Sequence, residues 1–153
     1  MKKLAVLLVP LILIGGYLLL NRPTDAPSRQ EETVPAATTA PENINYKATF
    51  SIITNGTTRI FTDPKYHNQS EDLFIEASNP NTVMVKKNGV TWNDFFKTLP
   101  MEITKECLTT GTGQIFCSDE TKTLRFFVND NEDKDALDKE IQNGDSLRVE
   151  YGI

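Results

Sequence analysis

The first 20 residues constrain this chain more than any other feature. After Lys2 and Lys3, the run from Leu4 to Leu20 holds 17 residues without a charge. As a helix it would be roughly 25 Å long, at 1.5 Å per residue. That length is at the short end of what the ~30 Å hydrocarbon core of a bilayer requires. The run therefore predicts a transmembrane helix, and the rest of the chain must fold outside the lipid.

A cleaved signal peptide is the main alternative for this segment, and a buried soluble helix is another. Signal peptides have an apolar region of about 7–15 residues and small residues at the cleavage site. Here the bulky Leu18, Leu19 and Leu20 stand at that place, so we predict an uncleaved signal anchor. Basic residues precede the span, and only Arg22 follows it closely. The positive-inside rule then predicts a single-pass protein of the cell membrane, with a cytoplasmic N-terminus and an extracytoplasmic C-terminal domain.

The composition divides the chain into three parts. Residues 21–44 contain four of the eight prolines together with Thr, Ala and Glu, and almost no residue that could fill a core. Such a composition predicts a disordered, solvated linker. Residues 45–153 contain Trp92 and all eight phenylalanines, which is enough for a core of their own. We therefore predict a signal anchor over residues 1–20, a linker over 21–44 and one domain over 45–153.

The charge of the chain belongs to the predicted domain. Four basic and four acidic residues cancel within residues 1–44, so the whole net charge of -5 lies in residues 45–153. An acidic domain without a basic stripe repels the phosphates of nucleic acid. Nucleic acid is therefore excluded as a partner.

Periodicity predicts a mostly β domain. Alternating apolar and β-branched residues indicate a strand over residues 46–53, and Asn55-Gly56 is a strong signal for a tight turn into a return strand. The strands expected after this first one cover residues 57–62, 73–77, 82–86, 103–108, 114–118, 124–128 and 147–151.

One helix is expected before the acidic region near the C-terminus. Thr91 and Asp94 form an approximate capping box, and Pro100 ends the helix. The apolar side chains at helical spacing lie on one face, which is typical of a core contact rather than of a ligand platform. They are Trp92, Phe95, Phe96 and Leu99.

The two cysteines flank a predicted hairpin. Cys107 and Cys117 lie symmetrically about Thr112, and opposed residues of antiparallel strands have Cα atoms ~4.5–5.5 Å apart, within disulfide range. The predicted extracytoplasmic side is usually oxidising, so both arguments favour a structural disulfide. A metal pair is an alternative that lacks partners, since His67 is the only histidine. A redox dithiol usually has Cys-x-x-Cys spacing.

The acidic run over residues 129–140 has the oxygen spacing of a calcium loop. Oxygen-bearing side chains stand at the ligand positions Asn129, Asn131, Asp133, Asp135 and Glu140. Such a loop needs glycine at its sixth position, where this chain has Lys134. We therefore interpret the run as a solvated crossover with a helical turn near residues 136–141, and we predict no metal and no cofactor.

The polar loop over residues 63–72 is the candidate region for catalysis. An envelope enzyme, or a metal-dependent accessory to one, would need four side chains of this loop to converge in a pocket. They are Asp63, His67, Glu71 and Asp72. The loop carries no nucleophile motif, so we predict that the domain is not an enzyme.

Two stretches carry a family resemblance. TLRFFVNDNEDKDALDKEIQNGDSLRVEYG, residues 123–152, resembles the last part of a β-grasp, or ubiquitin-like, domain. TWNDFFKTLPMEITKECL, residues 91–108, resembles a helix and the following strand in uncharacterised membrane-anchored proteins of candidate-phylum bacteria. A weaker similarity is to the transcobalamin C-terminal-like domain of unknown function. The resemblance spans residues 60–152 and implies a β-grasp-like fold, with one short helix on a mixed sheet.

The predicted fold class is therefore α+β, with a transmembrane helix preceding a small, mostly β domain. An anchor, a linker and a disulfide-pinned domain favour a membrane-anchored extracytoplasmic module for binding or interaction. Its expected partners are the membrane, through the N-terminal helix, and a protein of the cell envelope. An exposed sheet edge or apolar patch would be its binding surface. A structural envelope component and the envelope enzyme with its site around His67 are the alternatives.

Overall fold

The structure, a computed structural model, describes residues 44–153. The predicted signal anchor over residues 1–20 and the linker as far as residue 43 lie outside the described residues. Ile44, the last residue of the predicted linker, packs against the core of the domain. Within residues 44–153, no helix is long and apolar enough to cross a membrane.

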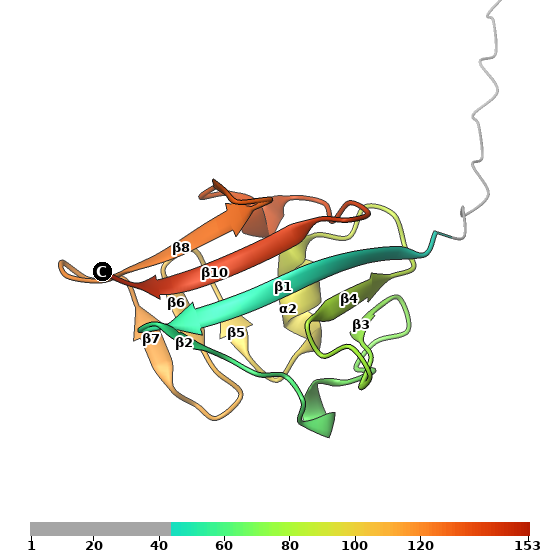
Figure 1. Cartoon of the computed structure of the whole chain (residues 1–153), viewed down its shortest axis with the longest axis horizontal. Coiled ribbons are helices and arrows are strands. Elements are labelled where there is room, and N and C mark those ends of the chain that lie inside the picture. The colour runs from blue at the N-terminus through green and yellow to red at the C-terminus, as the bar shows by residue number, and fades with distance from the viewer. Residues whose placement is uncertain (1–43) are drawn as a thin grey trace, which may run out of the picture. The chain divides into compact units, whose positions relative to one another are not determined.

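The larger sheet is built around two parallel strands. β1 (Tyr46–Thr54) and β10 (Ser146–Gly152) pair over six residues and lie side by side at its centre (Figure 1). The other strands of this sheet are β2 (Thr57–Thr58), β3 (Leu73–Ile75), β4 (Thr82–Val85), β8 (Thr123–Val128) and β9 (Asn131–Glu132). They run antiparallel to their neighbours, in the order β3-β4-β1-β10-β8-β9, while β2 pairs with the end of β1. The sheet is therefore mixed.

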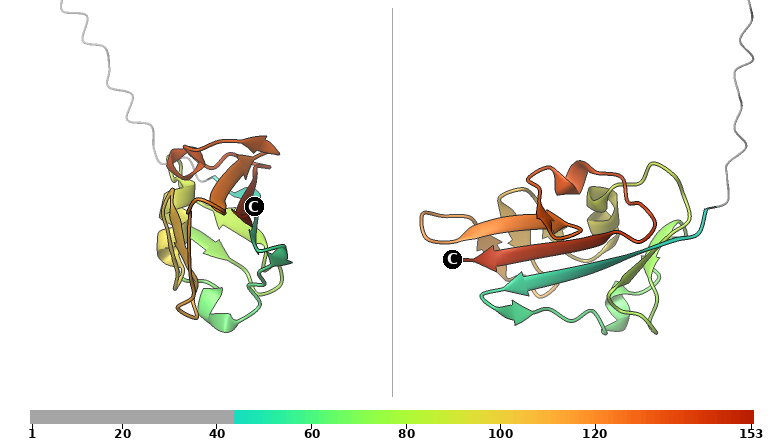
Figure 2. Two further views of the ribbon diagram at one scale, coloured as in Figure 1. Left: turned by 90° about the vertical axis from the view of Figure 1, so that its left-hand side faces the viewer. Right: turned by 45° about the horizontal axis from the view of Figure 1, so that its top comes forward.

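A second layer covers one face of the larger sheet. It consists of the helix α2 (Trp92–Thr98) and a smaller antiparallel sheet of β5 (Glu102–Ile103), β6 (Cys107–Thr109) and β7 (Ile115–Cys117). Figure 2 shows the helix and the smaller sheet on the same side of the larger sheet. Two short 3-10 helices, η1 (Pro64–Tyr66) and η2 (Ala136–Asp138), lie in the connections. The domain is thus mostly β with one short α-helix, which agrees with the predicted α+β class.

The core lies between the two layers. β1 buries alternate residues, including Phe50 and Ile52, because successive side chains of a strand point to opposite faces. α2 contributes Phe95 and Phe96, whose ring centroids lie 5.0 and 6.3 Å from that of Phe50. These edge-on contacts hold the helix on the sheet. The predicted apolar stripe of the helix is therefore part of the core.

The cap of α2 follows the predicted chemistry. The Thr91 Oγ1 accepts a hydrogen bond from the Asp94 N–H at 3.2 Å. In return, the Asp94 Oδ2 accepts hydrogen bonds from the N–H and the hydroxyl of Thr91, at 3.0 and 2.9 Å. Together they satisfy backbone N–H groups that a helix start leaves without a partner. The helix ends before Pro100, as predicted.

We expect Thr91→Ala to lower the free energy of unfolding by ~0.5–2 kcal/mol, because the helix loses its cap. Urea unfolding of the variant and of the wild-type chain measures this loss.

The hydrogen bonds that Asp94 accepts from Thr91 lower the pKa of the Asp94 carboxyl group from its ordinary value of 3.8. A carboxylate with a lowered folded pKa contributes stability above its unfolded pKa and loses it as the pH falls through the folded pKa. Asp94→Ala should therefore destabilise the domain more at pH 7 than at pH 2. Urea titrations at both pH values, with Asn93→Ala outside the cap as control, measure this difference, and equal losses at both would contradict it.

The first hairpin has the predicted turn but a shorter return strand. Asn55 and Gly56 have φ angles of 51° and 76°, which a two-residue hairpin turn requires and which this residue pair tolerates. The ladder with β1 ends soon after Thr58. Beyond it, the Phe61 side chain is buried in the core and the Asp63 carboxylate caps η1. The prediction of a strand over residues 57–62 is therefore wrong beyond Thr58.

The strand predicted over residues 103–108 is interrupted by a turn. The Thr104 Oγ1 accepts hydrogen bonds from the N–H groups of Glu106 and Cys107, at 3.3 and 3.0 Å. This threonine turn lets β5 fold back on β6 as a hairpin. The sequence thus contains two consecutive hairpins where the alternation of apolar residues predicts one.

The acidic run begins with a hairpin rather than a crossover. Asn129 and Asp130 have φ angles of 52° and 64° and join β8 to β9. The Asn129 Oδ1 accepts a hydrogen bond from the Ser146 N–H at 2.9 Å, which ties this turn to the start of β10. Asn and Asp tolerate the left-handed conformation better than most residues. After β9, the chain forms η2 within the region where a helical turn was expected.

Candidate functional site

The loop around His67 is organised mainly by contacts with the backbone. The half-buried His67 donates a hydrogen bond from Nε2 to the carbonyl oxygen of Phe61 at 2.8 Å. The Asp63 Oδ1 accepts a hydrogen bond from the Lys65 N–H at 3.0 Å. The other two acids of the candidate set, Glu71 and Asp72, are exposed. Across the part of the chain that the structure describes, no three side chains of His, Cys, Asp or Glu gather as a metal site would need.

The side chains of the calcium-like run have separate partners. Asp133 forms an ion pair with Lys139, which lowers the pKa of the aspartate and raises the pKa of the lysine. Asp135 accepts a hydrogen bond from Lys105 at 2.6 Å. Glu140 accepts one from the Gly89 N–H at 2.7 Å. Asn131 donates to the carbonyl oxygen of Asn129 at 3.0 Å. These contacts stabilise the connections around η2, and the run does not wrap around a common centre.

The two cysteines form the predicted disulfide. Cys107 and Cys117 are directly opposed in the register of β6 and β7, and their Cα atoms are 4.1 Å apart. The bond closes the β6–β7 hairpin at its base. The tip of this hairpin, around Thr112, forms one wall of a pocket.

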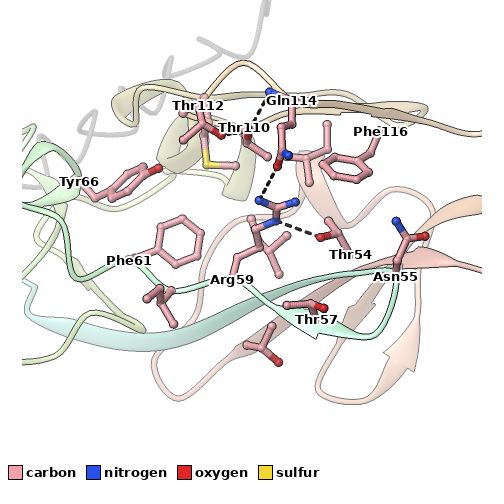
Figure 3. A pocket seen from close by; sticks show the side chains of 16 residues that line it. Thr54, Asn55, Thr57, Arg59, Phe61, Tyr66, Thr110, Thr112, Gln114 and Phe116 are labelled. Atoms are coloured by element: carbon pink, nitrogen blue, oxygen red, sulfur yellow. Dashed lines mark hydrogen bonds between the residues drawn. The ribbon is translucent and has the colours of Figure 1, made fainter.

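A pocket of about 560 Å³ opens between the end of β1 and the β6–β7 hairpin (Figure 3). Its floor is apolar and includes Ile52, Phe61 and Leu108, which are buried side chains of the core. Its lining also includes the hydroxyl groups of several threonines. The threonines that line it are Thr54, Thr57, Thr58, Thr110 and Thr112. A concave, mostly apolar site with a few polar groups is the usual form of a ligand pocket.

Arg59 crosses this pocket from one wall to the other. Its Nε donates a hydrogen bond to Oγ1 of Thr54 at 2.9 Å, and its Nη1 donates one to Oε1 of Gln114 at 3.0 Å (Figure 3). The guanidinium carbon also lies 4.9 Å from the centroid of the Phe116 ring, within the range of a cation–π contact. Among the described residues that line the pocket, Arg59 carries the only formal charge. The pocket is therefore positive, although the chain as a whole is acidic.

Tyr66 and Gly111 close the other end of the pocket. The Tyr66 ring packs edge-on against Phe61, with centroids 5.1 Å apart. A Cβ atom added at Gly111 would lie 2.5 Å from the Tyr66 hydroxyl oxygen and 2.9 Å from the Pro100 carbonyl oxygen. Glycine is therefore required at this position by close approach of its neighbours.

We expect Gly111→Ala to lower the free energy of unfolding by ~1–3 kcal/mol, because the methyl group overpacks the contact with Tyr66 and Pro100. The Tyr66 ring should move, and its NMR signals should shift with those of Phe61. Gly152→Ala is the matched control, since a Cβ there meets no atom within 4 Å. If both variants unfold at the same urea concentration, Gly111 is not constrained as described.

Neither motifs nor relatives lead to this pocket. Its two walls come from segments that appear in the sequence as ordinary strand and turn, and the hydrogen bond from Arg59 to Gln114 joins residues 55 positions apart. The one shared signal is a high content of threonine in TTRIFT and TTGTG, residues 57–62 and 109–113. Comparison of the chain with protein-family models, curated proteins and solved structures finds no match. A proposal of function must therefore rest on the geometry of the pocket.

Proposed function

We propose that this protein is a membrane-anchored extracytoplasmic binding module whose partner binds in the pocket beside Arg59. The observation that carries the proposal is the lining of that pocket. It combines a buried apolar floor with threonine hydroxyls and one guanidinium. Apolar area supplies affinity to such a site, and a few placed polar groups supply orientation and specificity.

The placement of the module rests on two features of the chain. The uncharged run from Leu4 to Leu20 has the length and flanking charges of a signal anchor. The disulfide between Cys107 and Cys117 favours an oxidising compartment, where disulfides persist. Both features support a domain displayed outside the cytoplasm.

We also propose that the domain is β-grasp-like, as the resemblance of residues 91–108 and 123–152 implies. The parallel pair of β1 and β10 among antiparallel neighbours supports this proposal, as does the packing of α2 on the mixed sheet. In this interpretation, the smaller sheet of β5, β6 and β7 is an addition between the helix and β8. The pocket then lies where the β-grasp frame meets its addition.

Site-specific photo-crosslinking in cells of the native source tests the binding proposal. The photoreactive residue replaces Thr112, which is exposed at the rim of the pocket, or Lys134, which is exposed and lines no part of it. We expect a discrete crosslinked product from position 112 and none from position 134. Equal products from both positions, or no product from position 112, would contradict a partner in this pocket.

The same cells test the placement. Protease added to intact spheroplasts should digest the domain of the full-length chain, because we propose that it faces outwards. Digestion only after lysis would contradict an extracytoplasmic domain, whatever the crosslinking shows. A cytoplasmic protein assayed in the same samples controls for leakage.

A further inference from the structure

The charge of the pocket selects an anionic partner. The chain has a net charge of -5, yet no Asp or Glu is among the described residues that line the pocket. Lys65 lies at its edge, where Nζ donates a hydrogen bond to the Gly111 carbonyl oxygen at 3.4 Å. The same Nζ is also 4.0 Å from the Asp63 carboxylate, so the positive charge of the pocket is mainly that of Arg59. An anion would therefore find attraction here and repulsion over much of the remaining surface.

The guanidinium of Arg59 still has hydrogen atoms to donate. A guanidinium has five N–H donors, and the side chain of Arg59 forms two hydrogen bonds within residues 44–153, to Thr54 and Gln114. It forms no ion pair with a carboxylate of those residues. By contrast, Arg148 on the other face of the sheet binds Glu150 at 2.6 Å. A planar carboxylate is the group that best matches the remaining fork of donors.

The residue after Arg59 has a backbone without hydrogen-bond partners among the described residues. The N–H of Arg59 donates to the carbonyl oxygen of Ile52 at 2.8 Å, which continues the ladder with β1. The next residue, Ile60, forms no backbone hydrogen bond within the described part of the chain, and its side chain is 75% exposed. The free N–H and C=O of this residue, next to the end of β2 (Thr57–Thr58), can pair with one residue of an extended peptide.

The floor of the pocket completes the set of contacts. Leu108 is fully buried beneath the pocket, and the half-buried Phe116 and Met101 line it. These surfaces can receive one apolar side chain close to the guanidinium. A free carboxylate next to an apolar side chain, on a chain that pairs with a strand edge, describes the C-terminus of an extended peptide.

We propose that the pocket recognises the C-terminal end of an extended peptide, with the α-carboxylate on Arg59, the last apolar side chain on the floor and the backbone paired with Ile60. This inference rests on the proposed function, because it names the partner that the pocket would hold. The peptide is the carboxyl end of an envelope protein. The pocket recognises it by its terminal carboxylate and last side chain, and not through an extended protein–protein interface.

Affinity selection with the full-length chain in detergent micelles tests the proposal. The probes are a randomised library of N-acetylated hexapeptides with free C-terminal acids and the same library with C-terminal amides. Acids with apolar last residues should be selected, and the best of them should bind at least ~10-fold more tightly than its amide. The backbone N–H signal of Ile60 should shift when the acid binds. N-acetyl-leucine, a small carboxylate with an apolar side chain, should bind much more weakly than the hexapeptide.

Variants assign the preference to one guanidinium. Arg59→Met should bind acid and amide equally, while Arg59→Lys should retain part of the preference because it keeps the charge but not the fork. Arg148→Met is the matched control, because Arg148 also lies over an aromatic ring, 3.9 Å from the centroid of Phe127. It should leave the preference unchanged. Circular dichroism of each variant verifies that the domain is folded.

Several results would overturn this proposal. Equal binding of acids and amides would show that Arg59 does not bind the peptide carboxylate. A preference for acids that persists in Arg59→Met would show the same. Binding of N-acetyl-leucine as tight as that of the hexapeptide would identify a small carboxylate instead of a peptide. If no peptide acid binds while position 112 still crosslinks a partner in cells, the proposal of a C-terminal peptide ligand is wrong, but the proposal of a binding module is retained. If no peptide acid binds and position 112 gives no crosslinked product, the proposed binding function is contradicted as well.

Discussion

Phe50→Ala is expected to lower the free energy of unfolding by ~3–5 kcal/mol, the usual loss for a large aromatic side chain removed from a core. Phe50 is 2% exposed, and its ring meets three others. The centroid of the Phe50 ring lies 4.8 Å from that of Phe61, 5.0 Å from that of Phe95 and 6.3 Å from that of Phe96. The substitution thus removes the side chain that joins the larger sheet to the helix and to the segment beneath the pocket. Since a whole domain is stable by only ~5–15 kcal/mol, much of its stability should be lost.

Urea unfolding followed by fluorescence measures this loss, because the only tryptophan, Trp92, is fully buried beside Phe95. Phe127→Ala is the matched control. Phe127 lies on the opposite face of the sheet, half-buried under Arg148, so its removal leaves no cavity in the core. Equal losses for Phe50→Ala and Phe127→Ala would mean that the aromatic cluster is not the centre of the core.

Removal of the disulfide should have the next largest effect. Replacement of both Cys107 and Cys117 with serine should lower the free energy of unfolding by ~2–3 kcal/mol, which is the loop-entropy value for so short a closed loop. The cysteines are separated by 10 residues, and the loop between them includes the tip of the hairpin beside the pocket. Thermal and urea unfolding of the oxidised chain and of the double-serine variant measure the change.

A reductant supplies the control for this prediction. Dithiothreitol should destabilise the wild-type chain by a similar amount and should leave the double-serine variant unchanged. If the pocket binds a peptide as proposed, that binding should also weaken in the variant, because Thr112 and Gln114 belong to the hairpin that the disulfide closes. An unchanged midpoint of unfolding after reduction would show that the hairpin is stable without its covalent bond.

Local chemistry made part of this fold predictable. The turn at Asn55-Gly56, the cap formed by Thr91 and Asp94, and the opposed pair Cys107 and Cys117 each depend on residues close in sequence. Each of these features can therefore be predicted from the residue types and their spacing alone. The mixed sheet followed only from the family resemblance, because the parallel pairing of β1 and β10 joins distant segments and leaves no local signal.

The remaining features depend on tertiary contacts that a local pattern does not contain. Residues 60–62 have strand-like composition, but Phe61 is buried in the core and these residues form no ladder with β1. Asn129 and Asp130 form a tight turn in a run whose oxygen spacing imitates a calcium loop. The pocket could not be predicted, since Arg59 and Gln114 meet only when the smaller sheet packs beside the end of β1.

The parallel pairing of β1 with β10 also determines when the domain can fold. The first and last strands of the domain occupy the centre of its sheet, and contacts such as the hydrogen bond from the Lys47 N–H to Asn143 join residues 96 positions apart. Contacts that join such distant residues slow folding, because the intervening chain must be ordered first. A nascent chain that lacks β10 would expose the edges of β1 and β8. We therefore expect the domain to fold only after β10 has been synthesised, and until then the exposed strand edges favour aggregation.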